Sequence, residues 1–141
     1  KRWLVKNCCR CNLTPKGNDM KLTLDDIGFL LFARSQLQVW HWQTQGFAMH
    51  QALGSLYESL DDLTDSLVEK DAAGGAVATP TPEFTNFQEF RFGVPEAFIT
   101  ETLKPFLANL EQKLTTESGL LNIVADMRNA ADQALYMLRL R

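Results

Sequence analysis

The stretch LQVWHWQTQGFAMHQALGSLYESLDDLTDSLVE, residues 37–69, contains both histidines of the chain and its clearest helical pattern. After the break at Gly46, leucines recur at the alternating spacing of a packed helical face. These are Leu53, Leu56, Leu60, Leu63 and Leu67. A second face of the same helix is mostly acidic and holds His50, Gly54, Glu58, Asp61, Asp65 and Glu69. The pattern predicts one helix with a packing side and a polar side.

The two histidines have two interpretations. His41 lies between two tryptophans at the end of one helical pattern, and His50 opens the next pattern. Each side chain suits either a metal site or a place in the core. Histidine and carboxylate ligands together are typical of iron, manganese or zinc. His50 and Asp65 are separated by roughly 22 Å along one helix, at about 1.5 Å per residue, so they cannot bind one ion within one subunit.

These residues also carry a resemblance. The stretch resembles the metal-site region of the Dps-type mini-ferritins, which have a His-Trp pair, a glycine, a second histidine and then spaced acids. The matching residues are His41, Trp42, Gly46, His50, Asp65 and Glu69. The chain departs from the family at Gly54, where a bridging carboxylate is usual, and its histidines are closer together in sequence. The wording of residues 41–69, with NIVADMRNAADQALYML near the end, is similar to uncharacterised ferritin-like proteins of tailed phages.

The resemblance implies a metal-binding protein that oxidises and sequesters Fe(II), a ferroxidase-type oxidoreductase, with manganese or zinc as alternative metals. The implied ligands are His41 and His50 of one subunit with Asp65 and Glu69 of a two-fold partner, and Glu58 as a substitute for the acid missing at Gly54. It also implies a homo-oligomer, from a dimer to a hollow twelve-subunit shell. Because that acid is missing, we expect weak or single-metal binding. The expected location is cytoplasmic, or the virion if the protein comes from a phage.

A second interpretation needs no metal. Acids at helical spacing commonly form a solvated face, and a histidine between tryptophans can simply fill core volume. The chain would then be a metal-free structural or interaction protein that keeps the helical bundle without the chemistry. Phosphate-binding loops and nucleophile motifs are not recognisable in the sequence.

The two parts of the chain differ in charge. Residues 1–21 hold six basic residues and Asp19, a net charge of +5, whereas residues 22–141 hold 8 basic and 16 acidic residues, a net charge of −8. A basic tail of this kind is either solvated or binds DNA weakly and without sequence preference. Its cations are Lys1, Arg2, Lys6, Arg10, Lys16 and Lys21. Its cysteines are Cys8, Cys9 and Cys11, of which Cys8 and Cys11 have the spacing of half a zinc site, although no second Cys or His pair follows nearby.

The remaining 120 residues, 22–141, are expected to form one domain. Thr23 and Asp26 predict a capped helix over about residues 24–43, with His41 at the end of its inward face. Further helices are expected from about residue 47 to 70, from Pro95 to about 114 with a kink or split at Pro105, and after Gly119. Four phenylalanines between the second and third helices should fold that long loop back onto the bundle. The helical patterns therefore predict an all-α four-helix bundle with a long loop between its second and third helices and no membrane contact. The resemblance implies that this bundle is ferritin-like.

Overall fold

The computed structural model describes residues 20–73, 75–80 and 86–140, and within these residues every regular element is a helix. The first two helices are α1, Leu24–Gln43, and α2, Phe47–Ala72. The next three elements, α3 (Val94–Phe98), the π-helical turn η1 (Ile99–Leu103) and α4 (Lys104–Lys113), follow one another without a gap. The last helix is α5, Ser118–Arg139. The expectation of an all-α chain is confirmed.

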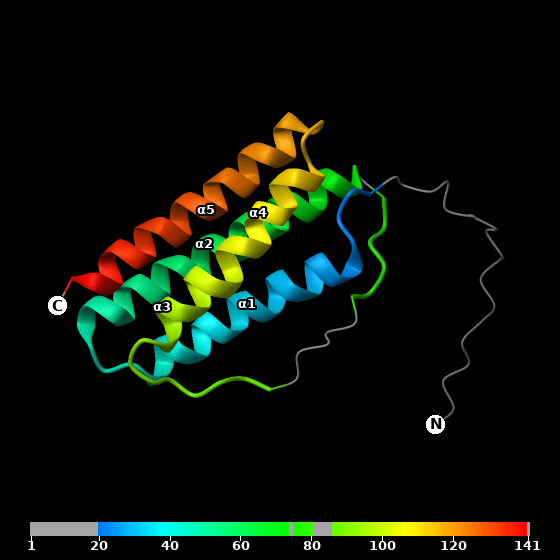
Figure 1. Cartoon of the computed structure of the whole chain (residues 1–141). Helices are drawn as coiled ribbons and strands as arrows, with labels where there is room; N and C mark the ends of the chain where they lie inside the picture. Colours follow the sequence, from blue (N-terminus) through cyan, green and yellow to red (C-terminus); the bar gives the residue numbers. More distant parts are fainter. Residues whose placement is uncertain (1–19, 74, 81–85, 141) are drawn as a thin grey trace, which may run out of the picture.

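The helices lie side by side along their length (Figure 1). α1 and α5 run in one direction, and α2 and the continuous α3–η1–α4 rod run in the other. α2 packs against both α1 and α5, and α4 packs against α5. α1 approaches the rod through side chains, with the rings of Phe29 and Phe106 centred 4.2 Å apart. The connection from α2 to α3 therefore returns along the whole length of the bundle.

The start of α1 is fixed by the residues that the sequence indicated. Thr23 Oγ1 accepts from the Asp26 backbone N–H, and the Asp26 carboxylate accepts from the Thr23 backbone N–H, which is a complete capping box. The same carboxylate binds Lys113 Nζ at the end of α4, 2.8 Å away. Burial alone would raise the pKa of Asp26, but the hydrogen bonds from Lys113 and Thr23 outweigh it and lower that pKa.

Pro105 leaves the third helical stretch continuous. The Lys104 N–H donates to Ile99 O, five residues back, so one widened turn lies directly before the proline. A π-helical turn of this kind accommodates a residue that cannot donate in the α-helical pattern. Instead of a kink or a split, the helix contains the π-helical turn η1, with regular α-helix before and after it.

The core lies between the four helical stretches. Leu53, Leu56, Leu60 and Leu67 of α2 are fully buried, as expected, whereas Leu63 is half-buried. The inward face of α1 was expected to contain Ile27, Leu30, Leu31, Arg34, Leu37, Gln38 and His41, and of these Ile27, Leu30 and Leu37 are buried. Trp40 is fully buried, while His41 is only half-buried and Leu31 is 46% exposed. α1 is covered on one side by α2 and on the other by the rod, so its buried face is rotated away from the row that contains His41.

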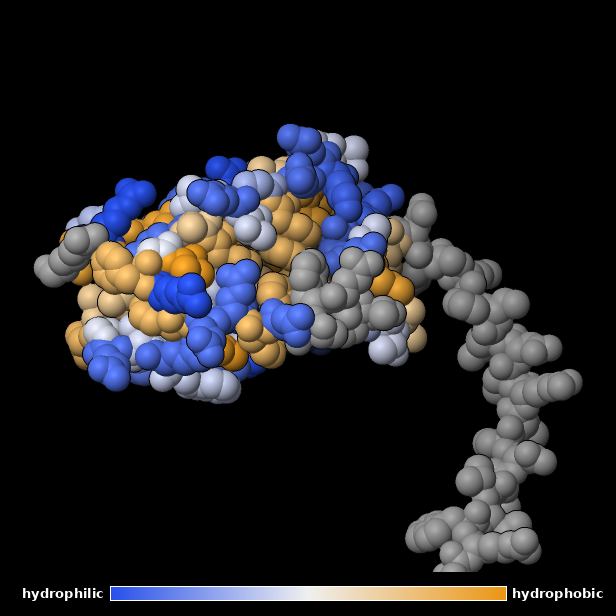
Figure 2. Space-filling view, turned by 60° about the horizontal axis from the view of Figure 1, so that its bottom comes forward, coloured by the Kyte–Doolittle hydropathy of each residue, from blue (hydrophilic) through white to orange (hydrophobic). Residues whose placement is uncertain are grey.

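The strap, residues 86–93, runs along α1 before α3 begins. The buried Gln36 side chain donates to Gln88 O and accepts from Gln88 N–H, and Trp40 Nε1 donates to the same carbonyl. Phe90 packs against the core, and the Phe87 ring stacks on Phe32 while remaining half exposed. Phe87 and Phe90 thus fold the loop back onto the bundle as expected, whereas Phe92 is 64% exposed and Phe84 lies outside the described residues. Figure 2 shows polar and apolar side chains interspersed over this part of the surface.

The predicted basic tail falls outside the structural description. Residues 1–19, with all three cysteines and every tail cation except Lys21, are not among the described residues, and the predicted DNA contact and half zinc site stay predictions. Among the described helices, none combines the length and apolar character needed to cross a membrane.

Candidate functional site

The two histidines lie against each other where α1 turns into α2. Thr44, Gln45 and Gly46 reverse the chain, so that His41 in the last turn of α1 faces His50 in the first turns of α2. The imidazole rings stack with their centres 3.7 Å apart and their planes at 26°. His41 Nδ1 lies 2.8 Å from His50 O, and His50 Nδ1 lies 2.9 Å from His41 O. Each ring is thus held by the backbone of the other histidine.

These two hydrogen bonds determine where each ring carries its proton. A backbone carbonyl oxygen can only accept, so each Nδ1 must be the donor. In the neutral ring the lone pair is then on Nε2, and this is the arrangement in which an Nδ1–H···O=C bond orients a metal-binding imidazole. In the neutral form of both rings, Nε2 therefore keeps its lone pair and makes neither of these two hydrogen bonds.

Gly54 makes room for this arrangement. A Cβ atom at position 54 would lie 3.1 Å from both Cε1 and Nδ1 of His41, closer than most Cβ contacts. The His41 ring thus occupies the space beside the position where the mini-ferritin pattern has a carboxylate. The departure at Gly54 is consequently more than a lost ligand, because a side chain at this position would press on the His41 ring and require it to shift by a few tenths of an ångström.

Tyr57 and Arg34 extend the site along both helices. Tyr57 is seven residues after His50 and Arg34 is seven residues before His41, so the antiparallel register of α1 and α2 places them opposite each other. The Tyr57 ring contacts His41 edge-on with ring centres 5.3 Å apart, and its hydroxyl lies 3.5 Å from Glu58 Oε1. The Arg34 guanidinium is 5.8 Å from the centre of the Tyr57 ring, and Arg34 Nε is 3.0 Å from Asp61 Oδ1. Their spacing from the histidines was the signal that sequence reasoning missed.

The predicted carboxylate ligands lie further along α2. Glu58, Asp65 and Glu69 are all exposed, and Asp65 is some 22 Å from His50 at the rise of about 1.5 Å per residue. Among the described residues, His, Cys, Asp and Glu side chains form no group of three that could hold a metal ion. Within one chain, the structure brings together His41 and His50 and leaves the three acids apart from them.

A shallow cavity of about 200 Å³ opens between α1 and α2 beyond Arg34. Its floor is apolar, with Ile27, Leu30 and Val68, and Asp61 and Asp65 lie along its edge. Leu31 lines the cavity from α1 while remaining largely exposed. The outer side of the α1–α2 pair therefore carries, in order from the turn, the stacked histidines, the Tyr57–Arg34 contact and an apolar hollow with an acidic edge.

The arrangement defines an all-helical bundle protein with a paired-histidine site at one end. The chain belongs to the family described as "Family of unknown function (DUF5856)", whose model matches residues 41–138. The matched region begins at His41 and contains all of α2 and the α3–η1–α4 rod and nearly all of α5. The comparisons with curated proteins and with solved structures gave no match.

Proposed function

We propose that this chain is a ferritin-like metal-binding protein that takes up and oxidises Fe(II), and that His41 and His50 are its histidine ligands. The observation that carries this proposal is the reciprocal hydrogen bonding of the two rings through Nδ1. It leaves the lone pair on Nε2 of each ring to bind a metal ion. Imidazole nitrogen is a good ligand for iron, and equally for zinc.

The remaining ligands come from a second copy of the chain. Rings that stack at 26° cannot both direct their in-plane lone pairs at one ion, so an ion bound here takes the imidazole of either His41 or His50 and needs further ligands. Exposed carboxylates satisfy this need, and Asp65 and Glu69 lie toward the opposite end of α2. A two-fold axis across the outer side of α1 and α2 places the acids of one copy beside the histidines of the other. With glycine at position 54 a bridging acid is missing there, so only one ion is held tightly.

The order of the helices supports the ferritin-like part of the proposal. In this bundle α2 and α4 run in the same direction and are joined by one long connection that includes the strap (Figure 1). A single long crossover of this kind is characteristic of ferritin-like bundles. Bundles of this class also place their metal ligands on facing helices, as α1 and α2 place the two histidines.

A metal-free role is the second candidate, and one observation favours it. His41 O belongs to the last turn of α1, where a carbonyl lacks an intrahelical partner, and the His50 ring donates to it. The His50 side chain thus caps α1, as histidines near helix C-termini do, and a structural role explains this bond without a ligand. In this case the protein uses the bundle for assembly or contact with a partner.

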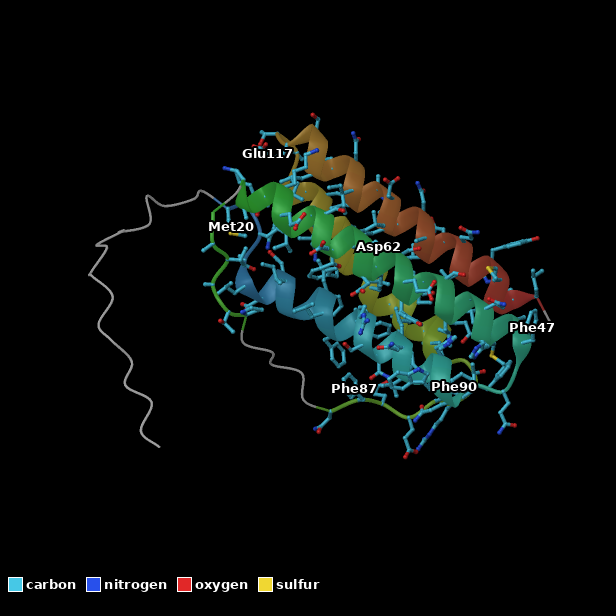
Figure 3. The ribbon with its side chains drawn as sticks, turned by 180° about the vertical axis from the view of Figure 1, so that it is seen from behind. Met20, Phe47, Asp62, Phe87, Phe90 and Glu117 are labelled. Atoms are coloured by element: carbon cyan, nitrogen blue, oxygen red, sulfur yellow. The ribbon has the colours of Figure 1, made fainter. Side chains whose placement is uncertain are left out.

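Metal titrations of variants at Asp65 and Glu69 separate the two candidate functions, because these substitutions leave the hydrogen bond from His50 to His41 O at the end of α1 unchanged. Anaerobic Fe(II) titration of Asp65→Asn and Glu69→Gln should show affinity lower by about tenfold or more than wild type, the loss expected for one charged contact. Asp62→Asn is the matched control. Asp62 is an exposed acid on the same helix (Figure 3) and continues the row of Ser55 and Ser59, which lies toward α5. It should bind as wild type does.

The results decide between the proposals. Equal Fe(II) binding by wild type, Asp65→Asn and Glu69→Gln would exclude Asp65 and Glu69 of a two-fold partner as ligands. His41 and His50 would then remain the proposed ligands. If wild-type protein binds no Fe(II), Mn(II) or Zn(II) in micromolar titrations, the metal-binding function is wrong and the metal-free role stands. His50→Ala adds a direct comparison, since it removes both the ligand and the cap.

A further inference from the structure

The hollow between α1 and α2 contains a buried hydroxyl that the fold leaves without a partner. Thr64 lines this hollow from α2 and is 6% exposed, and its Oγ1 makes no hydrogen bond within the described part of the chain. A buried hydroxyl without a partner lowers stability, and a valine would fill nearly the same space without that cost. The hydroxyl is therefore better explained by a ligand in the hollow than by packing.

The rest of the hollow determines the size and the apolar part of such a ligand. Its volume is about 200 Å³, and a cavity of roughly 150 Å³ accepts a benzene molecule. Ile27, Leu30 and Val68 form the floor, and Leu31 lines the hollow while remaining 46% exposed. A body of about six to eight carbon atoms fits this space, and its binding removes the apolar floor from water.

The charged groups at the edge indicate that the ligand is a cation. Among the described residues that line the hollow, Arg34 is the one cation, and it is already held by Asp61, 3.0 Å from its Nε, and by Gln38, which accepts from its Nη1. Asp65 lies at the same edge and has no ion pair within the described part of the chain. Its carboxylate attracts a positive group and repels an anion. Because the apolar floor offers no ligand to an inorganic ion, the complementary cation is an organic one.

We propose that the hollow binds a small primary amine with a compact apolar body. Such an amine is protonated at neutral pH, as the lysine side chain is. Of its three N–H donors, one binds Thr64 Oγ1 and one binds the carboxylate of the next residue, Asp65. The third remains in contact with water at the open edge, and the apolar body lies on the floor. This inference goes beyond the proposed function and does not depend on metal binding.

A second copy of the chain is the other candidate for covering this surface. Apolar side chains of a second copy would cover Leu31 and the floor, but they would give Thr64 Oγ1 no hydrogen bond. The amine supplies that hydrogen bond, so it fits the hollow whether or not two copies meet over it.

Benzylamine tests the inference with full-length protein, in the presence of a chelator so that metal ions do not compete for Asp65. In NMR titrations the methyl signals of the lining residues Ile27, Leu30, Leu31 and Val68 should shift, with a Kd on the order of 1 mM. Benzyl alcohol has nearly the same size without the charge and should bind about tenfold more weakly. Benzoate, which carries the opposite charge, should not bind measurably.

Two substitutions separate ligand binding from packing. Thr64→Val should lower the affinity for benzylamine by about fivefold or more, while the melting temperature stays the same or rises because the lost hydroxyl had no partner. Asp65→Asn should lower the affinity for benzylamine about tenfold and leave that for benzyl alcohol unchanged. Asp62→Asn removes an exposed acid of the same helix that does not line the hollow, and it should bind benzylamine as wild type does.

The inference is wrong if benzylamine moves none of these methyl signals, or if benzyl alcohol or benzoate binds as tightly as benzylamine. Wild-type affinity in Thr64→Val or Asp65→Asn would also exclude it. If the methyl signals respond to protein concentration and not to the amine, a second copy occupies the hollow and the amine site is wrong. None of these results changes the proposed function, which the metal titrations test separately.

Discussion

At the scale of single residues, Gly54 determines what the paired-histidine site can contain. The position lies on the polar side of α2 by sequence, yet it is buried because the His41 ring covers it. Sequence reasoning identified Gly54 as a departure from the mini-ferritin pattern and both histidines as candidate ligands. It did not foresee the stacking, because contact between two rings depends on the turn between the helices as well as on spacing along each helix.

Gly54→Ala should move the His41 ring with little net change in stability. Alanine favours a helix over glycine by about 1 kcal/mol, and losing the His41–His50 hydrogen bond costs about the same. Urea unfolding should therefore change by less than about 1 kcal/mol. The NMR signals of both imidazole rings should shift, and the affinity for metal should change with them. Unchanged imidazole signals would show that the ring has more room than the structure indicates.

Asp26 should make the free energy of unfolding of the bundle depend on pH in the acidic range. Its pKa is lowered in the folded state from the ordinary value of 3.8, so its contribution is complete above that value and is lost as pH falls through the lower folded pKa. Asp26→Asn should lower the free energy of unfolding by about 1–2 kcal/mol at neutral pH. The difference from wild type should shrink below pH 3.8, as measured by urea unfolding at several pH values. A constant difference across this range would contradict the assignment.

At the scale of helices, the local signals predicted the ends of elements better than their faces. The Thr23–Asp26 capping box and both ends of α1 were predicted correctly, because a cap depends on residues that are neighbours in sequence. The inward face of α1 was predicted only in part, because α1 meets α2 on one side and the α3–η1–α4 rod on the other, which also buries Trp40. The helical pattern alone does not reveal a second neighbour. The sequence indicated that Pro105 would disturb the third helix, but it did not predict the π-helical turn that accommodates the proline.

Gln36 was missed altogether, since an isolated glutamine gives no sequence signal for burial. It is 1% exposed, and both ends of its amide bind the backbone of Gln88. Gln36→Leu should destabilise the protein by about 2 kcal/mol, because two hydrogen bonds are lost: the Gln88 N–H loses its acceptor, and the Gln88 C=O keeps only Trp40 Nε1 as a donor. Gln38→Leu, on the half-buried row of α1, is the control and should change stability by less than 1 kcal/mol or so. If thermal unfolding shows the same loss of stability for both substitutions, the hydrogen bonds of Gln36 contribute no more to stability than Gln38 does.

At the scale of the whole molecule, the outer side of α1 and α2 is where the proposed two-fold partner has to pack. Leu31 lines the hollow on this side and is 46% exposed, so burying it is a reason for two copies to associate. We expect the native mass to correspond to a dimer or a larger assembly, and Leu31→Arg should shift it toward the monomer in light scattering. Leu140→Arg, at an equally exposed leucine after α5, should leave the mass unchanged. A monomeric wild type would exclude the shared site.

The hydrogen bonds between Gln36 and Gln88 also bear on the order in which the chain folds. They join residues separated by 52 positions, whereas the His41–His50 contacts around the α1–α2 turn join residues nine positions apart. Closing a long loop costs more entropy than closing a short one, so the α1–α2 hairpin should form early and the strap should attach late. Interactions made after the transition state mainly slow the escape from the native state. We therefore expect the hydrogen bonds of the Gln36 amide to slow unfolding while leaving the folding rate nearly unchanged.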